Sequence, residues 1–244
     1  MTTPDLDRFD SRRSTLYAPN GAVATSQPLA AMAGVSILQD GGNAFDAAVA
    51  TAAALNVVEP TSTGLGGDVF ALYRTADGDI GGMQSCGSAP ADATVETVRR
   101  AVARNRDEDP GDVEMPTTGP HTVTVPGTAR GWEAILERFG RLDLGAALQS
   151  AIQYAKTGYP VTEVVSSQWE HAEELFSDEN AREAYLFDGS APETGQTVSL
   201  PELGHSLERV AEEGADVVYE GEIAEAIVEE VQSHGGFLSL EDMA

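Results

Sequence analysis

The sequence contains few basic residues. Forty acidic residues face fourteen basic ones, which gives a formal net charge of −26, and Lys156 is the one lysine among 244 residues. Nucleic acids and anionic membranes are bound by basic surfaces, so this charge argues against both as partners. The acids are spread along the whole chain. This favours adaptation to high intracellular salt, which screens self-repulsion, over the alternative of an acidic interaction protein.

Cysteine is almost absent as well. Cys86 stands alone, which excludes an internal disulfide and a cysteine-rich metal site. The four histidines, His121, His171, His205 and His234, show no metal-ligand spacing. The dinucleotide, P-loop, serine-hydrolase and zinc-protease motifs are also missing. We therefore expect neither a metal nor a cofactor.

Long apolar runs are a third absence. No stretch approaches the ~18 apolar residues that a membrane-spanning helix needs. Residues 1–8 lack the basic and apolar regions of a secretory signal peptide. We expect a cytoplasmic protein that does not enter a membrane. Residues 1–21 are polar and irregular, and are expected to form a poorly ordered lead-in to one segment over 22–244.

The stretch from Gly41 to Phe70 is the most distinctive part of the chain. Twelve of the fifteen residues from 44 to 58 are apolar and seven of them are alanine, a pattern typical of a buried helix. Asn43 is expected to cap this helix, with Asp46 in its first turn, where the helix dipole favours a carboxylate. Pro60 ends the helix, and a glycine cluster at 64–67 precedes a strand.

The rest of the chain is predicted mainly from apolar periodicity and turn signals. Ser26 is expected to cap a helix over 28–38, and residues 104–120 are expected to form a polar loop. Strands are expected at 69–74, 80–84 and 121–125. Helices are expected over 128–139, 144–156, 164–176, 202–213 and 221–234, with a further helix starting at Ser239.

The loop Ser85–Pro90 is the main candidate for a binding site. It follows a strand, has small side chains and offers hydroxyl and backbone N–H groups, which suits a small polar substrate. Cys86, Gly87 and Ser88 are the candidate substrate-binding residues. An ordinary strand-to-helix loop, with Asp92 or Thr94 capping the next helix, is the alternative. A Cys86–His121 nucleophile pair is a further possibility, although no third orienting group is identifiable.

Several motifs, in their order along the chain, resemble the hallmarks of the gamma-glutamyltransferase (gamma-glutamyltranspeptidase) family. The resemblance covers about 22–244. The motifs are ATSQPLA at 24–30, GGNAFDAAVA at 41–50, VEP at 58–60, GLGG at 64–67, TVPGT at 124–128, AKTGYPV at 155–161 and HGGFLSLED at 234–242.

The resemblance implies part of an N-terminal-nucleophile hydrolase fold, an αββα sandwich of the α/β class, with a helix-rich C-terminal half. In this family a precursor cleaves itself before a threonine, which begins the small subunit and acts as the nucleophile. No threonine of this chain matches it, so catalytic residues are expected to be absent here. A small catalytic subunit is the implied partner. A helix start over Ser239–Asp242 lies two residues before the end of the sequence at Ala244, and it is expected to be an interruption, from truncation or from completion by a second chain.

The resemblance also bears on the substrate, a small-molecule amide. Gamma-glutamyltransferases carry an arginine shortly before the match to Ala89-Pro90, and it binds the α-carboxylate of the substrate. Here residues 84–88 contain no arginine, and Asp68 stands where glycine is usual. The chain therefore looks closer to the acylase and amidohydrolase branch, although that branch usually has a basic residue near Ser88. Two other hypotheses remain: a non-catalytic scaffold remnant or partner subunit, and an independent Cys86 thiol hydrolase.

Overall fold

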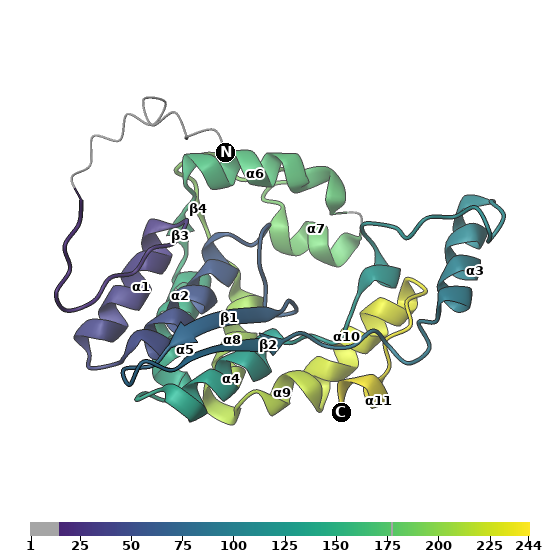
Figure 1. Cartoon of the computed structure of the whole chain (residues 1–244). Helices are drawn as coiled ribbons and strands as arrows, with labels where there is room; N and C mark the ends of the chain where they lie inside the picture. The colour runs from purple at the N-terminus through teal and green to yellow at the C-terminus, as the bar shows by residue number, and fades with distance from the viewer. Residues whose placement is uncertain (1–14, 177) are drawn as a thin grey trace, which may run out of the picture.

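The computed structural model describes residues 15–176 and 178–244, and it is rich in helices (Figure 1). The part of the predicted lead-in at 1–14 lies outside the described residues, and residues 15–21 contain no helix or strand. The elements are α1 (Pro28–Gln39), α2 (Ala44–Val58), β1 (Val69–Arg74), β2 (Ile80–Ser85), α3 (Val95–Arg106), η2 (Pro120–Thr122), α4 (Thr128–Phe139), α5 (Leu144–Thr157), β3 (Tyr159–Pro160), α6 (Glu163–Ala172), η3 (Glu173–Leu175), α7 (Glu179–Tyr185), β4 (Thr197–Val198), α8 (Pro201–Glu213), α9 (Asp216–Tyr219), α10 (Glu222–Ser233) and α11 (Leu240–Met243).

The alanine-rich helix α2 lies at the centre of the helical layer. It packs against α1, α4 and α5, and α5 in turn packs against α8. Small side chains such as Ala50, Ala53 and Ala54 are almost fully buried in these contacts, since they let neighbouring backbones approach closely. The predicted cap is confirmed. Asn43 and Asp46 form a capping box, in which each side chain accepts a hydrogen bond from the backbone of the other.

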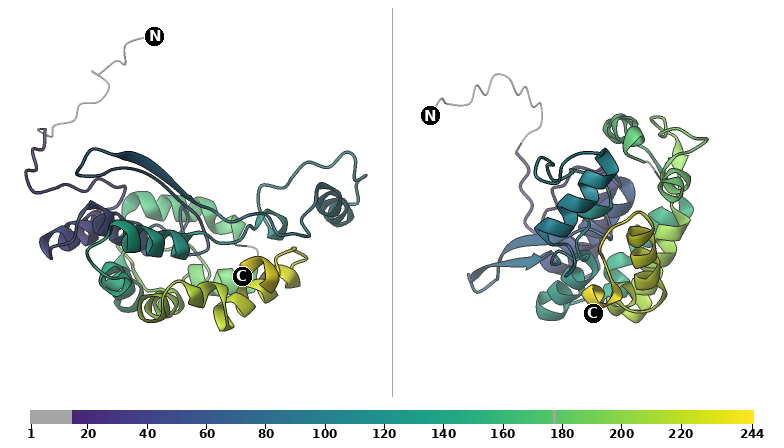
Figure 2. Two further views of the ribbon diagram at one scale, coloured as in Figure 1. Left: turned by 60° about the horizontal axis from the view of Figure 1, so that its bottom comes forward. Right: turned by 90° about the vertical axis from the view of Figure 1, so that its right-hand side faces the viewer.

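The strands β1 and β2 form an antiparallel hairpin, which lies along one face of the helices (Figure 2). Its inward-facing residues contact α4. In the described residues this hairpin and the short pair β3–β4 are the two sheets. The other pattern-based helices also appear close to their expected bounds. Ser239 and Asp242 form a second capping box at the start of α11.

Two local expectations are wrong. Residues 121–125 do not form a strand: Gly119, at φ 96°, leads into the 3₁₀ turn η2, and Val125 makes a single backbone bond, N–H to the carbonyl oxygen of Ser88. Ser26 does not cap α1, because Gln27 occupies the cap position. The Ser26 hydroxyl instead donates to Glu59 at 2.5 Å, a long-range contact that local pattern cannot show.

The short helices α7 and α9 were not expected from the sequence. Each has fewer than two full apolar turns, so periodicity gives little signal. Among the described residues, no helix combines the length and apolar character needed to cross a bilayer. The helical layer and the hairpin together place three loops side by side, and these loops form the candidate site.

Candidate functional site

Three loops from distant parts of the sequence meet at the end of the hairpin. The carbonyl oxygen of Gly67 accepts hydrogen bonds from the N–H groups of Gly127 and Thr128, at 2.8 and 3.0 Å. The Ser85 hydroxyl donates to the Gly127 carbonyl oxygen at 2.7 Å. The start of α4 is thus fixed both to the glycine cluster before β1 and to the end of β2, and Ser88 is bound to Val125 by a further backbone bond.

Glycine is required where these loops touch. A Cβ atom on Gly87 would lie 1.9 Å from the carbonyl oxygen of Val125, and one on Gly127 would lie 2.2 Å from that of Ser85. Contacts that short do not occur in folded proteins, so any side chain at these positions would force the loops apart. The candidate segment at 85–88 is therefore held tightly against the loop that begins α4.

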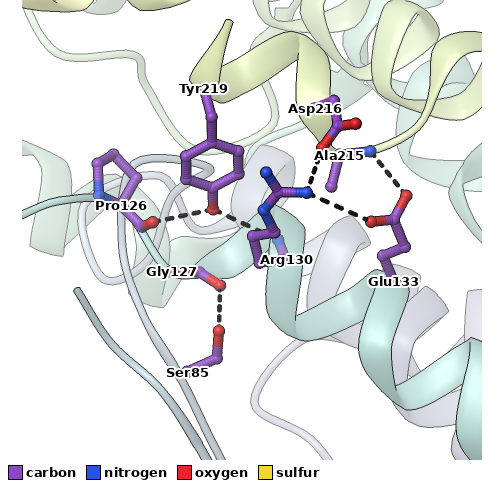
Figure 3. Close-up of polar contacts among 8 residues, drawn as sticks. All are labelled: Ser85, Pro126, Gly127, Arg130, Glu133, Ala215, Asp216 and Tyr219. Atoms are coloured by element: carbon purple, nitrogen blue, oxygen red, sulfur yellow. Dashed lines mark hydrogen bonds and ion pairs between the residues drawn. The ribbon is translucent and has the colours of Figure 1, made fainter. Parts of the chain in front are cut away.

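A cluster of polar side chains braces the same loop from the other side (Figure 3). The hydroxyl of the buried Tyr219 donates to the Pro126 carbonyl oxygen at 2.9 Å. The guanidinium of Arg130 lies 4.6 Å above the Tyr219 ring and forms an ion pair with Asp216. Glu133 accepts a hydrogen bond from the Ala215 N–H at 2.9 Å.

These contacts join α4 to α9 and hold the Pro126 turn. Burial raises the pKa of Tyr219, and the neighbouring Arg130 partly opposes that effect. The hydroxyl therefore stays protonated near neutral pH and can act as a donor. Sequence reasoning did not find this cluster, because Tyr219 lies on the unexpected helix α9, 93 residues from Pro126.

The structure places the predicted substrate-binding residues together at the end of β2. Cys86 is half-buried, and its Sγ accepts a hydrogen bond from Gln84 Nε2 at 2.9 Å. Gly87 is partly buried and Ser88 is exposed. The alternative expectation of a helix cap is met beside them, since the Thr94 hydroxyl accepts from the Thr97 N–H at the start of α3.

The Cys86–His121 pair is not formed. His121 is buried, and neither of its ring nitrogens has a hydrogen-bond partner among the described residues, so none is bonded to the Cys86 sulfur. Burial lowers the pKa of His121, which keeps the ring neutral. Lys156, in the last turn of α5 as expected, pairs with Glu208 at 2.8 Å.

One face of the hairpin beside this site is uncovered. Phe70 and Leu72 on β1 and Ile80 on β2 are 67%, 91% and 80% exposed, and the alternation of the two strands places them on the same face. The opposite face packs against α4. Within the described ranges, no group of three or more His, Cys, Asp or Glu side chains is arranged to hold a metal ion.

Comparison with known proteins assigns the chain to a family. The family model for gamma-glutamyltranspeptidase matches residues 30–244. The glutathione hydrolase-like YwrD proenzyme of Bacillus subtilis is 35% identical over 226 residues, covering 90% of this chain and 40% of that protein. The chain therefore spans well under half the length of this relative.

Solved structures agree with this assignment. The cephalosporin acylase of Bacillus halodurans superimposes with a TM-score of 0.87 at 39% identity, over 100% of this chain and 45% of that one. The gamma-glutamyltranspeptidase of Helicobacter pylori gives 0.85 at 28% identity, over 94% and 65%. The predicted fold class, a large-subunit portion of an N-terminal-nucleophile hydrolase, is confirmed. The chain belongs to the gamma-glutamyltranspeptidase family.

Proposed function

We propose that this chain is the first part of the large subunit of an enzyme that cleaves an amide and transfers the acyl group to water or an amine. The nucleophile in this proposal is an N-terminal threonine on a small subunit, outside these 244 residues. Family membership supports the reaction class, and a relative that is a proenzyme supports maturation into two subunits.

The observation that carries the proposal is the uncovered apolar face of the β1–β2 hairpin. Phe70, Leu72 and Ile80 expose large apolar side chains next to one another, and such patches mark surfaces that another element covers. In an αββα sandwich two sheets face each other. We assign this face to contact with the small subunit, and the adjoining segment Cys86–Ser88 to contact with the substrate.

The segment at the end of β2 also bears on which amide is cleaved. It offers the exposed Ser88 and the half-buried Cys86 thiol, but no cation that could bind the α-carboxylate of a glutamyl group. We therefore propose an acyl amide other than a gamma-glutamyl one as the preferred substrate. Slow turnover of gamma-glutamyl amides follows from the same observation.

The test is to express the chain alone and together with the region that follows it in its gene. Both preparations are assayed with an aliphatic acyl p-nitroanilide and with gamma-glutamyl-p-nitroanilide. We expect no turnover by the chain alone, and turnover of the acyl amide well above that of the glutamyl amide by the completed protein. A completed protein without amide-cleaving activity would instead support the non-catalytic scaffold hypothesis. Brisk release of glutamate would overturn the substrate assignment.

We further propose that the protein works in a salt-rich cytoplasm. Forty acids cannot be neutralised by fourteen basic residues, and mutual repulsion between them is screened as ionic strength rises. The melting temperature should therefore rise when KCl is increased from about 0.1 M, where the Debye length is about 10 Å, to about 1 M, where it is about 3 Å. A melting temperature that falls or stays constant over this range would contradict the proposal.

A further inference from the structure

The hydroxyl of Tyr219 lies at the start of α4, where that helix has no cap of its own (Figure 3). The first N–H groups of a helix have no partner within the helix, and a polar side chain at the cap position usually accepts from one of them. In α4 the cap position is Gly127, which has no side chain. The Tyr219 hydroxyl accepts from the Arg130 N–H at 3.4 Å instead, while it donates to the Pro126 carbonyl oxygen at 2.9 Å. A residue of α9 therefore caps α4.

The ring that carries this hydroxyl is itself held in place. Tyr219 is 5% exposed, and the Arg130 guanidinium lies 4.6 Å from the centre of its ring. A cation over an aromatic face is attracted by the ring electrons. The same guanidinium pairs with Asp216, the first residue of α9. Arg130 thus holds Tyr219 both through its backbone and through its side chain.

Two contacts connect the turn at Pro126 with the segment Cys86–Ser88. The N–H of Val125, the residue before Pro126, donates to the Ser88 carbonyl oxygen at 3.1 Å. The Val125 carbonyl oxygen lies so close to Gly87 that no Cβ atom fits between them. Close-packed contacts of this kind transmit a displacement, because there is no free space to absorb it. A shift of the Pro126 turn should therefore move the segment Cys86–Ser88.

We propose that Tyr219 is a positioning residue for the segment Cys86–Ser88. Its hydroxyl fixes the Pro126 carbonyl group, and the backbone of Val125 carries this constraint to the segment. The consequence for the reaction rests on the proposed function, in which the segment contacts the substrate. The effect of Tyr219 on the position of the segment does not depend on that function.

The thiol of Cys86 provides a direct measure of this position. Cys86 is the one cysteine among the 244 residues, its side chain is half-buried, and its Sγ accepts a hydrogen bond from Gln84. The rate at which a thiol reacts depends on its exposure and on its thiolate fraction. The rate of modification by dithiodipyridine is measured at constant pH in the completed protein, and mass spectrometry identifies the peptide that contains Cys86.

The chain offers a matched control for each test variant. Tyr219→Phe removes the hydroxyl and keeps the ring. Its control is Tyr159→Phe, because the Tyr159 hydroxyl is also buried and also donates to a backbone carbonyl oxygen, in α2. Arg130→Gln is paired with Arg138→Gln on the same helix, where the Arg138 guanidinium lies 5.0 Å from the centre of the Phe139 ring. The two Phe variants should lower the urea midpoint by similar amounts, since each loses one hydrogen bond.

We expect Cys86 to react about fivefold faster in Tyr219→Phe than in the unmodified protein, the factor that corresponds to a lost hydrogen bond of about 1 kcal/mol. Arg130→Gln should raise the rate as well. Tyr159→Phe and Arg138→Gln should leave it unchanged. Equal rates in Tyr219→Phe and Tyr159→Phe would overturn the proposal, whether or not the completed protein cleaves an amide.

Kinetics distinguish failure of this proposal from failure of the proposed function. With the acyl p-nitroanilide, Tyr219→Phe should lower kcat/KM about fivefold, mainly through a higher KM, and Tyr159→Phe should not. A completed protein without activity would contradict the proposed function alone, because the thiol rate still decides whether Tyr219 positions the segment. An unchanged kcat/KM in an active Tyr219→Phe variant would overturn its role in the reaction.

Discussion

Asp46 accepts a hydrogen bond from the backbone N–H of Arg141 at 2.9 Å, although the two residues are 95 positions apart. The same carboxylate accepts from the N–H of Leu142 at 3.1 Å and from that of Asn43 at 2.7 Å. The Asn43 amide, in turn, donates to the Phe139 carbonyl oxygen at 2.6 Å. The cap of α2 is thus also the contact that fixes the turn between α4 and α5.

Replacing Asp46 should therefore lower the free energy of unfolding by more than the loss of an ordinary helix cap does. Asp46 is fully buried, and Asp46→Ala would remove the charged acceptor that the N–H groups of Asn43, Arg141 and Leu142 share. We expect the free energy of unfolding to fall by about 3 kcal/mol or more. Asp143→Ala, which removes the exposed cap of α5, should cost about 1 kcal/mol. Urea unfolding of the two variants provides the measurement, and equal losses would contradict the double role of Asp46.

The sequence predicted the cap that Asn43 and Asp46 form at the start of α2. It did not predict the bonds from the same carboxylate to the turn at Arg141. An Asn followed three residues later by an Asp, before an alanine-rich run, indicates a capped buried helix, and the structure confirms it. Nothing in that pattern points to Arg141. The same limit explains the error at Ser26, whose hydroxyl binds Glu59 rather than the helix end, and the error at 121–125, where a strand-like composition lacks a neighbouring strand to pair with.

Gly87 lies where its loop touches the loop at Val125, so even the methyl group of alanine should lower stability at this position. Gly87→Ala would place a methyl group 1.9 Å from the Val125 carbonyl oxygen, so one of the two loops must move. We expect a loss of stability of about 2 kcal/mol or more, within the range of overpacked cores, and a displaced Ser88. Gly66→Ala is the matched control, because a Cβ atom there meets nothing within 4 Å. Thermal unfolding measures both losses of stability, and equal losses in Gly87→Ala and Gly66→Ala would disprove the role assigned to Gly87.

The candidate site was likewise predicted only in part. The sequence indicated the segment Ser85–Pro90 from its small residues after a strand, and the structure places Cys86, Gly87 and Ser88 there. It did not indicate what holds the segment. The segment is held by the Tyr219 hydroxyl and by backbone bonds between Gly67 and Gly127, and all of these contacts join residues far apart in the sequence. Spacing motifs do not encode such contacts.

The buried hydroxyl of Tyr159 leads to a prediction for alkaline pH. It donates to the Val57 carbonyl oxygen at 2.7 Å, and burial, with a smaller effect from Tyr185, raises the pKa of Tyr159 well above its usual value. The unfolded chain releases this proton near pH 10, whereas the folded chain keeps it. Stability contributed by Tyr159 is therefore complete below about pH 10 and is lost as pH rises toward the higher folded pKa.

Removal of that hydroxyl should flatten the pH dependence. Above about pH 10, Tyr159→Phe should reduce the slope of the unfolding free energy by at most about 1.4 kcal/mol per pH unit, the value for one proton. At neutral pH the variant should lose about 1 kcal/mol for the missing hydrogen bond. Urea unfolding at several pH values between about 8 and 11 measures both effects. A slope equal to that of the unmodified protein would show that Tyr159 does not govern it.

A single cation at the end of β2 should alter substrate preference. Residues 84–88 carry no positive charge, and the Cys86 side chain is half-buried beside the exposed Ser88. In the completed protein, Cys86→Arg would supply a fork able to bind the α-carboxylate of a gamma-glutamyl amide. We expect kcat/KM for gamma-glutamyl-p-nitroanilide to rise about tenfold or more, since one charge-assisted pair contributes about 1.5–3 kcal/mol. Cys86→Gln, which adds length without charge, is the control and should give no such gain.

An equal gain in both variants would show that charge at this position does not select the substrate. Loss of turnover of the acyl amide in Cys86→Arg but not in Cys86→Gln would place the new guanidinium in contact with the substrate.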